Sequence, residues 1–129
     1  MKHREIGQLI RRRNVVSLSG AATVREASKL MAEQRVGAIL VMDGSSLLGI
    51  FTERDALNRV LAEERDPDST PISEVMTGNL VTLGPRATAV DALRLMTQIG
   101  FRHLPVVEED EVCGIISLRD FVSAEFQQV

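Results

Sequence analysis

The apolar residues of the first 65 positions follow two different periods. After Thr23 they fall at Val24, Ala27, Leu30 and Met31, which is the spacing of one helical face. Short apolar runs lie on either side, and the sequence Asp-Gly-Ser-Ser at residues 43–46 is typical of a hairpin turn. The predicted elements are a strand at 15–18, a helix from residue 24, strands at 38–42 and 47–51, and a helix at 53–61. The order is β-α-β-β-α.

The same pattern returns 65 positions later, without a gap, from Val81 to Asp120. Twelve of the 40 aligned pairs are identical, and most others keep their character, as in Ser17/Thr82. With one inserted residue the match extends upstream, where Ile6 faces Ile72. A repeat of this length indicates a duplicated supersecondary unit that cannot bury its apolar face alone. The predicted fold class is α+β (α/β-like), with two β-α-β-β-α repeats.

The second copy predicts a strand at 80–83, a helix opened by Thr88, strands at 104–107 and 112–116, and a helix from 118 to about 126. Residues 66–71, Asp-Pro-Asp-Ser-Thr-Pro, are predicted to be a linker, because prolines and small polar residues disfavour a continued helix. The predicted organisation is a first repeat over 1–65 with an N-terminal helical segment, the linker 66–71, and a second repeat over 72–129.

Composition and charge exclude several classes of protein. The apolar share of 44% and the charged share of 26% are those of a globular chain. A net charge of −3 leaves no basic field for nucleic acid or anionic membrane, and the run at 11–13 is interpreted as a solvated helix end. Cys113 is the single cysteine, and no apolar window is long enough to span a membrane. We expect a cytoplasmic protein that binds neither nucleic acid nor membrane.

The candidate chemistry lies where the last strand of each copy turns into a helix, at residues 52–55 (Thr-Glu-Arg-Asp) and 117–120 (Ser-Leu-Arg-Asp). If Thr52 and Ser117 are N-caps, the helix start presents free N–H groups that suit an anion. The aspartate one turn later can accept from paired hydroxyls such as those of a ribose, and the arginine has donors suited to phosphate. The alternative is that both are capping boxes that bind nothing.

The duplicated unit resembles the cystathionine-β-synthase (CBS) domain, and the chain resembles a stand-alone CBS pair, or Bateman module. The matching features are residues 70–77 (Thr-Pro-Ile-Ser-Glu-Val-Met-Thr), residues 101–107 (Phe-Arg-His-Leu-Pro-Val-Val) and the two Gly-x-x-Thr/Ser-x-Arg-Asp endings. The resemblance implies a pseudo-twofold axis between the repeats and a homodimer. It also implies a cleft between the copies with two sites for adenine-containing ligands such as AMP, ADP, ATP or S-adenosylmethionine.

Each implied site joins the turn of one copy to the middle strand of the other. The first would combine Thr52, Arg54, Asp55, Thr82, Arg102, His103 and Pro105. The second would combine Ser117, Arg119, Asp120, Ser17, Gly37, Ala38 and Ile39. Copy one departs from the family pattern, because Leu40 stands where copy two has Pro105, and its neighbours Gly37 and Ala38 carry no charge. We therefore expect the first site to bind a nucleotide more tightly.

Catalytic side chains are scarce in this sequence. The two histidines are His3 and His103, and Cys113 aligns with Leu48, so we expect it to be a small core residue. No nucleophile with a base, paired acid and base, or metal-ligand set stands out, and the chain is predicted not to be an enzyme and to need no cofactor. Two interpretations remain. One is a nucleotide-sensing regulatory module that signals to an effector protein of unspecified identity, and the other is a structural dimerisation module that binds no nucleotide.

Overall fold

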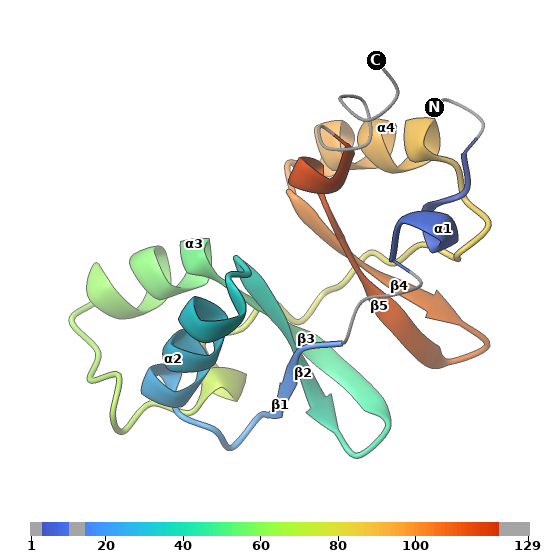
Figure 1. The fold of residues 1–129 in the computed structure, drawn as a ribbon. Helices are drawn as coiled ribbons and strands as arrows, with labels where there is room; N and C mark the ends of the chain where they lie inside the picture. The colour runs from blue at the N-terminus through green and yellow to red at the C-terminus, as the bar shows by residue number, and fades with distance from the viewer. Residues whose placement is uncertain (1–3, 11–14, 122–129) are drawn as a thin grey trace. The chain divides into compact units, whose positions relative to one another are not determined.

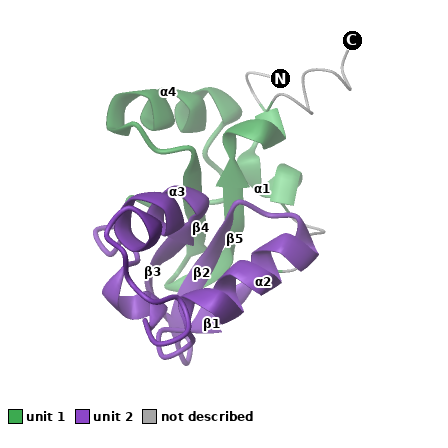
Figure 2. Ribbon diagram, turned by 90° about the vertical axis from the view of Figure 1, so that its left-hand side faces the viewer, with its two compact units in different colours: residues 1–15, 81–129 green, residues 16–80 purple. Residues whose placement is uncertain are grey.

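The computed structural model describes residues 4–10 and 15–121, and the fold is mixed α+β (Figure 1). The chain forms two compact units, one of residues 16–80 and the other of residues 1–15 together with 81–129 (Figure 2). The elements follow the predicted order in the 16–80 unit, and in the second unit the first predicted strand is reduced to a single bridge. The basic run at 11–13, His3 and the end of the last predicted helix lie outside the described residues.

The 16–80 unit contains a three-stranded sheet in the order β1-β2-β3. Strand β1 pairs in parallel with β2, and β2 pairs antiparallel with β3 around the predicted hairpin turn. The last predicted helix of this copy is a short α-helix that continues as a π-helix, η1. The elements are β1 (Ser17–Ser19), α2 (Val24–Gln34), β2 (Ala38–Asp43), β3 (Ser46–Thr52), α3 (Glu53–Asp55), η1 (Ala56–Leu61) and the 3-10 turn η2 (Ile72–Glu74).

The second unit is built on the hairpin of β4 and β5. Its elements are α1 (Ile6–Ile10), α4 (Ala89–Ile99), β4 (His103–Glu108) and β5 (Glu111–Ser117), and residues 118–121 are helical. The strand predicted at 80–83 is wrong in extent, because only Leu83 pairs there, in a parallel bridge to Val106. Leu83 accepts from the Val107 N–H at 2.8 Å and donates to the Pro105 carbonyl at 3.1 Å. Pro105 has no N–H, so it can only accept in this pairing.

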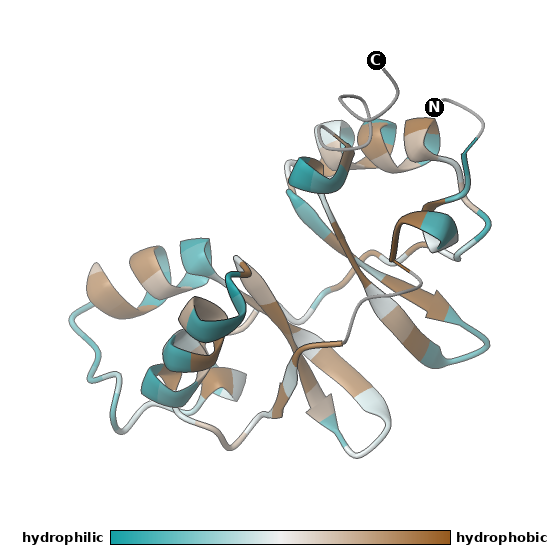
Figure 3. Ribbon diagram, in the orientation of Figure 1, coloured by the Kyte–Doolittle hydropathy of each residue, from teal (hydrophilic) through white to brown (hydrophobic). Residues whose placement is uncertain are grey.

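Each unit has its own hydrophobic core, and hydrophobic residues run along the strands of both (Figure 3). In the 16–80 unit the core forms around Phe51, Ile39 and Val41, and in the second unit around Leu104 and Ile116. Cys113 is half-buried against the second core, in line with the expected packing role. Among the described residues, no helix is both long and apolar enough to cross a bilayer.

The N-terminal segment packs with the second repeat rather than with the first. Ile6 is fully buried in the core of the second unit, and its N–H donates to the Ala87 carbonyl at 2.8 Å. In the 16–80 unit the equivalent position is filled by Ile72, whose N–H donates to the Ala22 carbonyl at 2.8 Å. Each unit therefore contains the segment that precedes the other repeat in the sequence: residues 1–15 belong with the second repeat, and residues 66–80 belong with the first. The compact units consequently have different boundaries from the sequence repeats.

The linker predicted at 66–71 packs against the start of α2. The carbonyl of Thr70, a buried residue, accepts from the Val24 N–H at 2.9 Å. The Arg25 side chain forms an ion pair with Asp68, with a distance of 2.9 Å between Nε and Oδ1. The hydrogen bond from Arg25 lowers the pKa of the Asp68 carboxyl below its ordinary value. These contacts fix the linker on the 16–80 unit.

Helices α2 and α4 begin where the sequence predicts. Thr23 and Thr88 cap α2 and α4 by accepting from the N–H three residues later, at 3.1 Å in each case. Both helices end on a residue in the left-handed region, Arg35 in α2 (φ 56°) and Gly100 in α4 (φ 76°). A residue with a Cβ is disfavoured there, whereas glycine is not.

We expect the substitution Arg35→Gly to stabilise the protein by about 1 kcal/mol, because it relieves the left-handed conformation at an exposed position. Gly100→Ala, at the aligned position of the second copy, should lower the stability by a similar amount. The measurement is the guanidinium unfolding midpoint of each variant. A loss of stability in Arg35→Gly would mean that the arginine side chain contributes packing that outweighs the backbone gain.

Candidate functional site

The turn between β3 and α3 is closed by a reciprocal pair of hydrogen bonds. The Thr52 hydroxyl accepts from the Asp55 N–H at 3.1 Å, and the Asp55 carboxylate accepts from the Thr52 N–H at 3.0 Å. The predicted capping box is therefore present. Both ends of the box are satisfied within the 16–80 unit.

Asp55 makes more contacts than a capping box requires. The residue is 6% exposed, and the Thr77 hydroxyl donates to Oδ1 at 3.2 Å. Arg59, one turn further along, brings Nε to 3.7 Å from the same oxygen and donates from its Nη1 to the Met76 carbonyl at 2.7 Å. Asp55 thus ties the start of the helix to the segment that follows η2. A buried carboxylate with these partners is a structural element as well as a candidate ligand group.

At the same turn, the carboxylate of Glu53 lies next to Gly37. The Glu53 N–H donates to the Gly37 carbonyl at 3.0 Å, and Ala38 lies opposite Thr52 in the sheet. A Cβ atom placed on Gly37 would lie 3.1 Å from Oε1 of Glu53. The Glu53 carboxylate therefore sits directly beside this end of β2.

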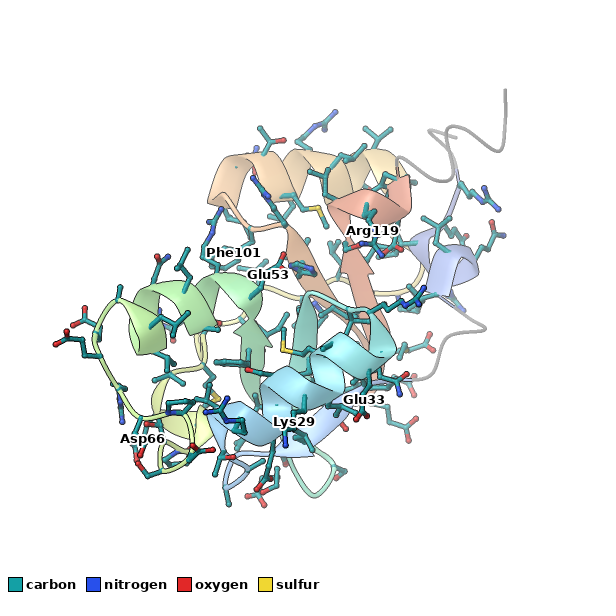
Figure 4. All side chains as sticks on the ribbon, turned by 60° about the vertical axis from the view of Figure 1, so that its left-hand side comes forward. Lys29, Glu33, Glu53, Asp66, Phe101 and Arg119 are labelled. Atoms are coloured by element: carbon teal, nitrogen blue, oxygen red, sulfur yellow. The ribbon has the colours of Figure 1, made fainter. Side chains whose placement is uncertain are left out.

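The turn after β5 repeats this backbone geometry with other side chains. The Ser117 N–H donates to the Asp120 carboxylate at 2.6 Å, and the Ser117 hydroxyl lies 3.1 Å from the same oxygen. The Leu118 N–H donates to the Arg102 carbonyl at 2.9 Å, and His103 lies opposite Ser117 in the sheet. Arg119 is exposed at the start of the helical residues 118–121 (Figure 4).

The structure groups the predicted site residues by unit. The 16–80 unit holds Thr52, Arg54, Asp55, Ser17, Gly37, Ala38 and Ile39. The other unit holds Ser117, Arg119, Asp120, Thr82, Arg102, His103 and Pro105. Arg102 and His103 are neighbours of Ser117 and Leu118 within one unit, and both implied sites draw on two units. The composition of those sites therefore stays a prediction.

Three residues at or beside the first turn were not predicted from the sequence, namely Thr77, Arg59 and Glu53. Thr77 belongs to the segment 70–77 that carried the family resemblance, but its pairing with Asp55 needs the folded chain. Arg59 follows Asp55 by four residues, a spacing that could have indicated the contact. The sequence predicts no role for Glu53, which stands between Thr52 and Arg54.

An open pocket of about 560 Å³ lies elsewhere on the 16–80 unit. Its lining consists of Ser19, Gly20, Ala21, Met42, Asp43, Leu48, Pro71 and Ser73, none of which is a predicted site residue. Asp43 is at the hairpin end of β2, whereas Ala38 at the other end pairs with Thr52. Among the described residues, no group of three or more His, Cys, Asp or Glu side chains is placed to hold a metal ion.

The family model for the CBS domain matches the chain twice, at residues 6–62 and 72–126. The chain belongs to the CBS domain family. Its two matches flank the segment 66–71 and cover both strand-to-helix turns.

Proteins similar to this CBS pair occur in bacteria, archaea and plants. The CBS domain-containing protein YhcV of Bacillus subtilis is 41% identical over 106 residues, which are 82% of this chain and 75% of that protein. A solved structure titled a putative signal-transduction protein with CBS domains, from Burkholderia ambifaria, has a TM-score of 0.91 and 32% identity over 96% of this chain and 95% of that one. In plants, the chain matches about a fifth of the length of a 39% identical CBS domain-containing protein of Arabidopsis thaliana, over 84% of its own.

One further structure contains a ligand. The CBS domain protein PAE2072 from Pyrobaculum aerophilum was solved in complex with AMP. It is 26% identical to this chain, with a TM-score of 0.83, and the match covers 98% of this chain and all of that one.

Proposed function

We propose that this CBS pair is a regulatory module that binds an adenine nucleotide and catalyses no reaction. The observation that carries the proposal is the AMP complex of a relative that matches this chain over nearly its full length. In our proposal, bound nucleotide changes the packing of the two units, or of two chains, and so alters an effector protein.

The strand-to-helix turns supply the chemistry that such a ligand needs. A carboxylate at the fourth position of each turn can accept from the two hydroxyls of a ribose, and an exposed arginine precedes it, Arg54 in one copy and Arg119 in the other. The chain has no Trp or Tyr, so the adenine would lie against aliphatic side chains. Val16 and Val81, which open the two repeats, are partly buried and are candidates for this contact.

We expect millimolar AMP, ATP or S-adenosylmethionine to raise the thermal unfolding midpoint of the protein. A ligand at 100 times its dissociation constant stabilises the folded state by about 2.7 kcal/mol. For a chain of this size that corresponds to roughly 10 °C. Inorganic phosphate at the same concentration is the control, because it lacks the adenosine. If none of the adenosyl ligands moves the midpoint, the chain is not a nucleotide sensor.

A second candidate function is a dimerisation module that binds no nucleotide, and two observations favour it. The Thr52–Asp55 box is satisfied within its own unit, as expected for a purely structural cap. Leu57 and Leu61 lie one turn apart on η1 and are 58% and 66% exposed. Exposed leucines at this spacing form an apolar stripe that a second copy of the chain would cover.

We therefore expect a homodimer in sedimentation at micromolar concentration. The double substitution Leu57→Glu/Leu61→Glu should shift the protein to monomer, because it places two charges in the apolar stripe. Lys29→Glu, at an exposed position on α2, is the control for a change of charge. If the parent protein sediments only as a monomer, the expected homodimer does not form and the dimerisation function is wrong.

A further inference from the structure

The turns that precede α2 and α4 are closed by the same hydrogen bond. The Ala22 N–H donates to the Ser19 carbonyl at 3.0 Å, and at the aligned place in the second unit the Ala87 N–H donates to the Gly84 carbonyl at 3.2 Å. A bond of this kind closes a β-turn of four residues, 19–22 in one copy and 84–87 in the other. Because the duplication supplies the same turn twice, the two copies can be compared side chain by side chain.

The side chains packed on these two turns differ. In the second unit the turn contains Pro85, and a Cβ placed on its neighbour Gly7 would lie 2.9 Å from the Pro85 Cβ. The aligned pair in the 16–80 unit is Gly20 and Ser73. Its backbone contact is the same, because the Ser73 N–H donates to the Gly20 carbonyl at 3.1 Å and the Gly7 N–H donates to the Pro85 carbonyl at 2.8 Å. The first unit therefore has a glycine and a serine where the second unit has a packed proline ring.

Gly20 and Ser73 lie in the wall of the open pocket of about 560 Å³ on the 16–80 unit, which we call the Asp43 pocket. Its apolar lining includes Met42, Leu48 and Pro71. Leu48 is the residue left unpaired by the bulge in β3, and it is 37% exposed. A bulge redirects side chains and is common next to binding sites. The pocket thus offers an apolar wall to an incoming aliphatic group.

The polar lining of the Asp43 pocket is acidic. In the part of the chain that the structure describes, the exposed carboxylate of Asp43 forms no ion pair and no hydrogen bond. Ser19 and Ser73 add hydroxyl oxygens, and the lining residues include no lysine, arginine or histidine. A free carboxylate and hydroxyl acceptors beside an apolar wall suit an ammonium group at the end of an aliphatic arm. That is the chemistry of a lysine side chain.

From these observations we infer that the Asp43 pocket is a docking site for a segment of a partner protein in which a lysine stands beside an apolar residue. The ammonium group pairs with Asp43, and the apolar neighbour packs on Leu48 and Pro71. A protein segment fits this pocket better than a free small molecule does, because small-molecule sites enclose most of their ligand and this pocket is open. The inference goes beyond the proposed function and does not depend on nucleotide binding.

Two variants of the 16–80 unit test the site. Asp43→Asn removes the charge and keeps the size of the side chain. Gly20→Pro/Ser73→Gly places the second copy's pair in the first turn, whose second position accepts proline. Both substitutions are needed together, because a Cβ on Gly20 would lie 3.0 Å from the Ser73 Cβ. Glu33→Gln is the control, because it removes one exposed acid on α2, outside the pocket (Figure 4).

The probe is the capped peptide acetyl-Leu-Lys-Leu-amide, and its analogue with glutamate in place of lysine is the control for charge. Amide chemical shifts of the ¹⁵N-labelled full chain, measured at low salt without nucleotide, report where each peptide binds and how tightly. We expect the lysine peptide to shift the amides of Ser19, Ala21, Leu48 and Ser73, with a millimolar dissociation constant. The glutamate peptide should leave these amides unchanged.

Asp43→Asn should weaken binding of the lysine peptide by about three- to fivefold, as expected for the loss of one exposed ion pair. Gly20→Pro/Ser73→Gly should abolish the shifts, because the proline ring takes up the space beside the turn. Glu33→Gln should bind like the parent protein.

Several results would overturn the inference. The carboxylate does not select the ligand if Asp43→Asn binds the lysine peptide as tightly as the parent protein, or if the glutamate peptide shifts the same amides. Binding of n-butylammonium as tightly as the peptide would make the pocket a site for small amines and not a docking site. No shift at the pocket with the lysine peptide would also show the inference to be wrong. None of these results bears on the thermal shift expected with AMP, so the proposed function stands or fails separately.

Discussion

Truncation of Ile6 to alanine is expected to destabilise the unit formed by residues 1–15 and 81–129 by about 2–5 kcal/mol, the usual cost of removing a large aliphatic side chain from a packed core. Ile6 is 0% exposed and lies in the core with Leu104, Ile116 and Phe121. Its backbone is fixed by hydrogen bonds, and its neighbour Gly7 approaches Pro85 so closely that a Cβ would lie 2.9 Å from the Pro85 carbonyl oxygen. The segment therefore has little freedom to refill the cavity.

Native-state hydrogen exchange measures this effect unit by unit. In Ile6→Ala the amides of β4 and β5 should lose protection, while those of β2 and β3 keep theirs, because residues 16–80 have a separate core. Ile72→Ala is the matched variant, since Ile72 fills the equivalent place in the other unit, and it should give the reverse pattern. Gln8→Ala, at an exposed position of α1, is the control. Equal loss of protection in both units from either isoleucine variant would show that the units unfold as one.

The order of the elements could be predicted from the sequence because it depends on local signals. Helical spacing from Val24, the hairpin sequence at 43–46 and the capping threonines act over a few residues, and the structure has each of them. Because the sequence is duplicated, the same pattern occurs in both repeats and supports the same order of elements twice. The departure at 80–83 has a physical reason, since strand pairing there depends on a distant partner, Val106.

The exchange of segments between the repeats could not be predicted in this way. Ile6 and Ile72 align with each other, but the alignment does not reveal that each packs beside the other repeat's helix. That choice depends on tertiary contacts such as the fit of Gly7 against Pro85. The sequence repeat and the folding unit therefore need not coincide.

The candidate site was predictable in its residue types and not in their surroundings. The Thr52 and Ser117 turns were recognisable because a cap and an acid stand three residues apart. The burial of Asp55 under Thr77 depends on a segment 22 residues away in the chain. From the sequence alone, Asp55→Ala and Asp120→Ala should cost similar, small amounts of stability, because Thr52 and Ser117 still cap. The structure changes that expectation for one of the two.

Asp55→Ala is expected to lower the free energy of unfolding by about 2–3 kcal/mol, because it leaves a half-buried hydroxyl and a backbone N–H without their acceptor and removes a charge-assisted hydrogen bond. The groups affected are the Thr77 hydroxyl and the Thr52 N–H, with Arg59 losing its ion pair. Asp120→Ala should cost about 1 kcal/mol, since Asp120 is half-buried and its carboxylate contacts Ser117 near the surface. Urea unfolding of both variants measures the difference.

The same two variants distinguish a structural role of each aspartate from a role in nucleotide binding. If the second turn holds the ligand, Asp120→Ala should lose nucleotide affinity at little cost in stability, and Asp55→Ala should lose stability while the remaining folded protein binds as before. Asp55→Asn is the control for side-chain size, because its amide oxygen can still accept from the Thr52 N–H, whereas its NH2 group replaces the oxygen that accepts from Thr77 and the charge beside Arg59 is lost. Equal stability losses in the two alanine variants would mean that the contacts of Asp55 with Thr77 and Arg59 add nothing to the capping box. Unchanged affinity in Asp120→Ala would remove this carboxylate from the ligand site.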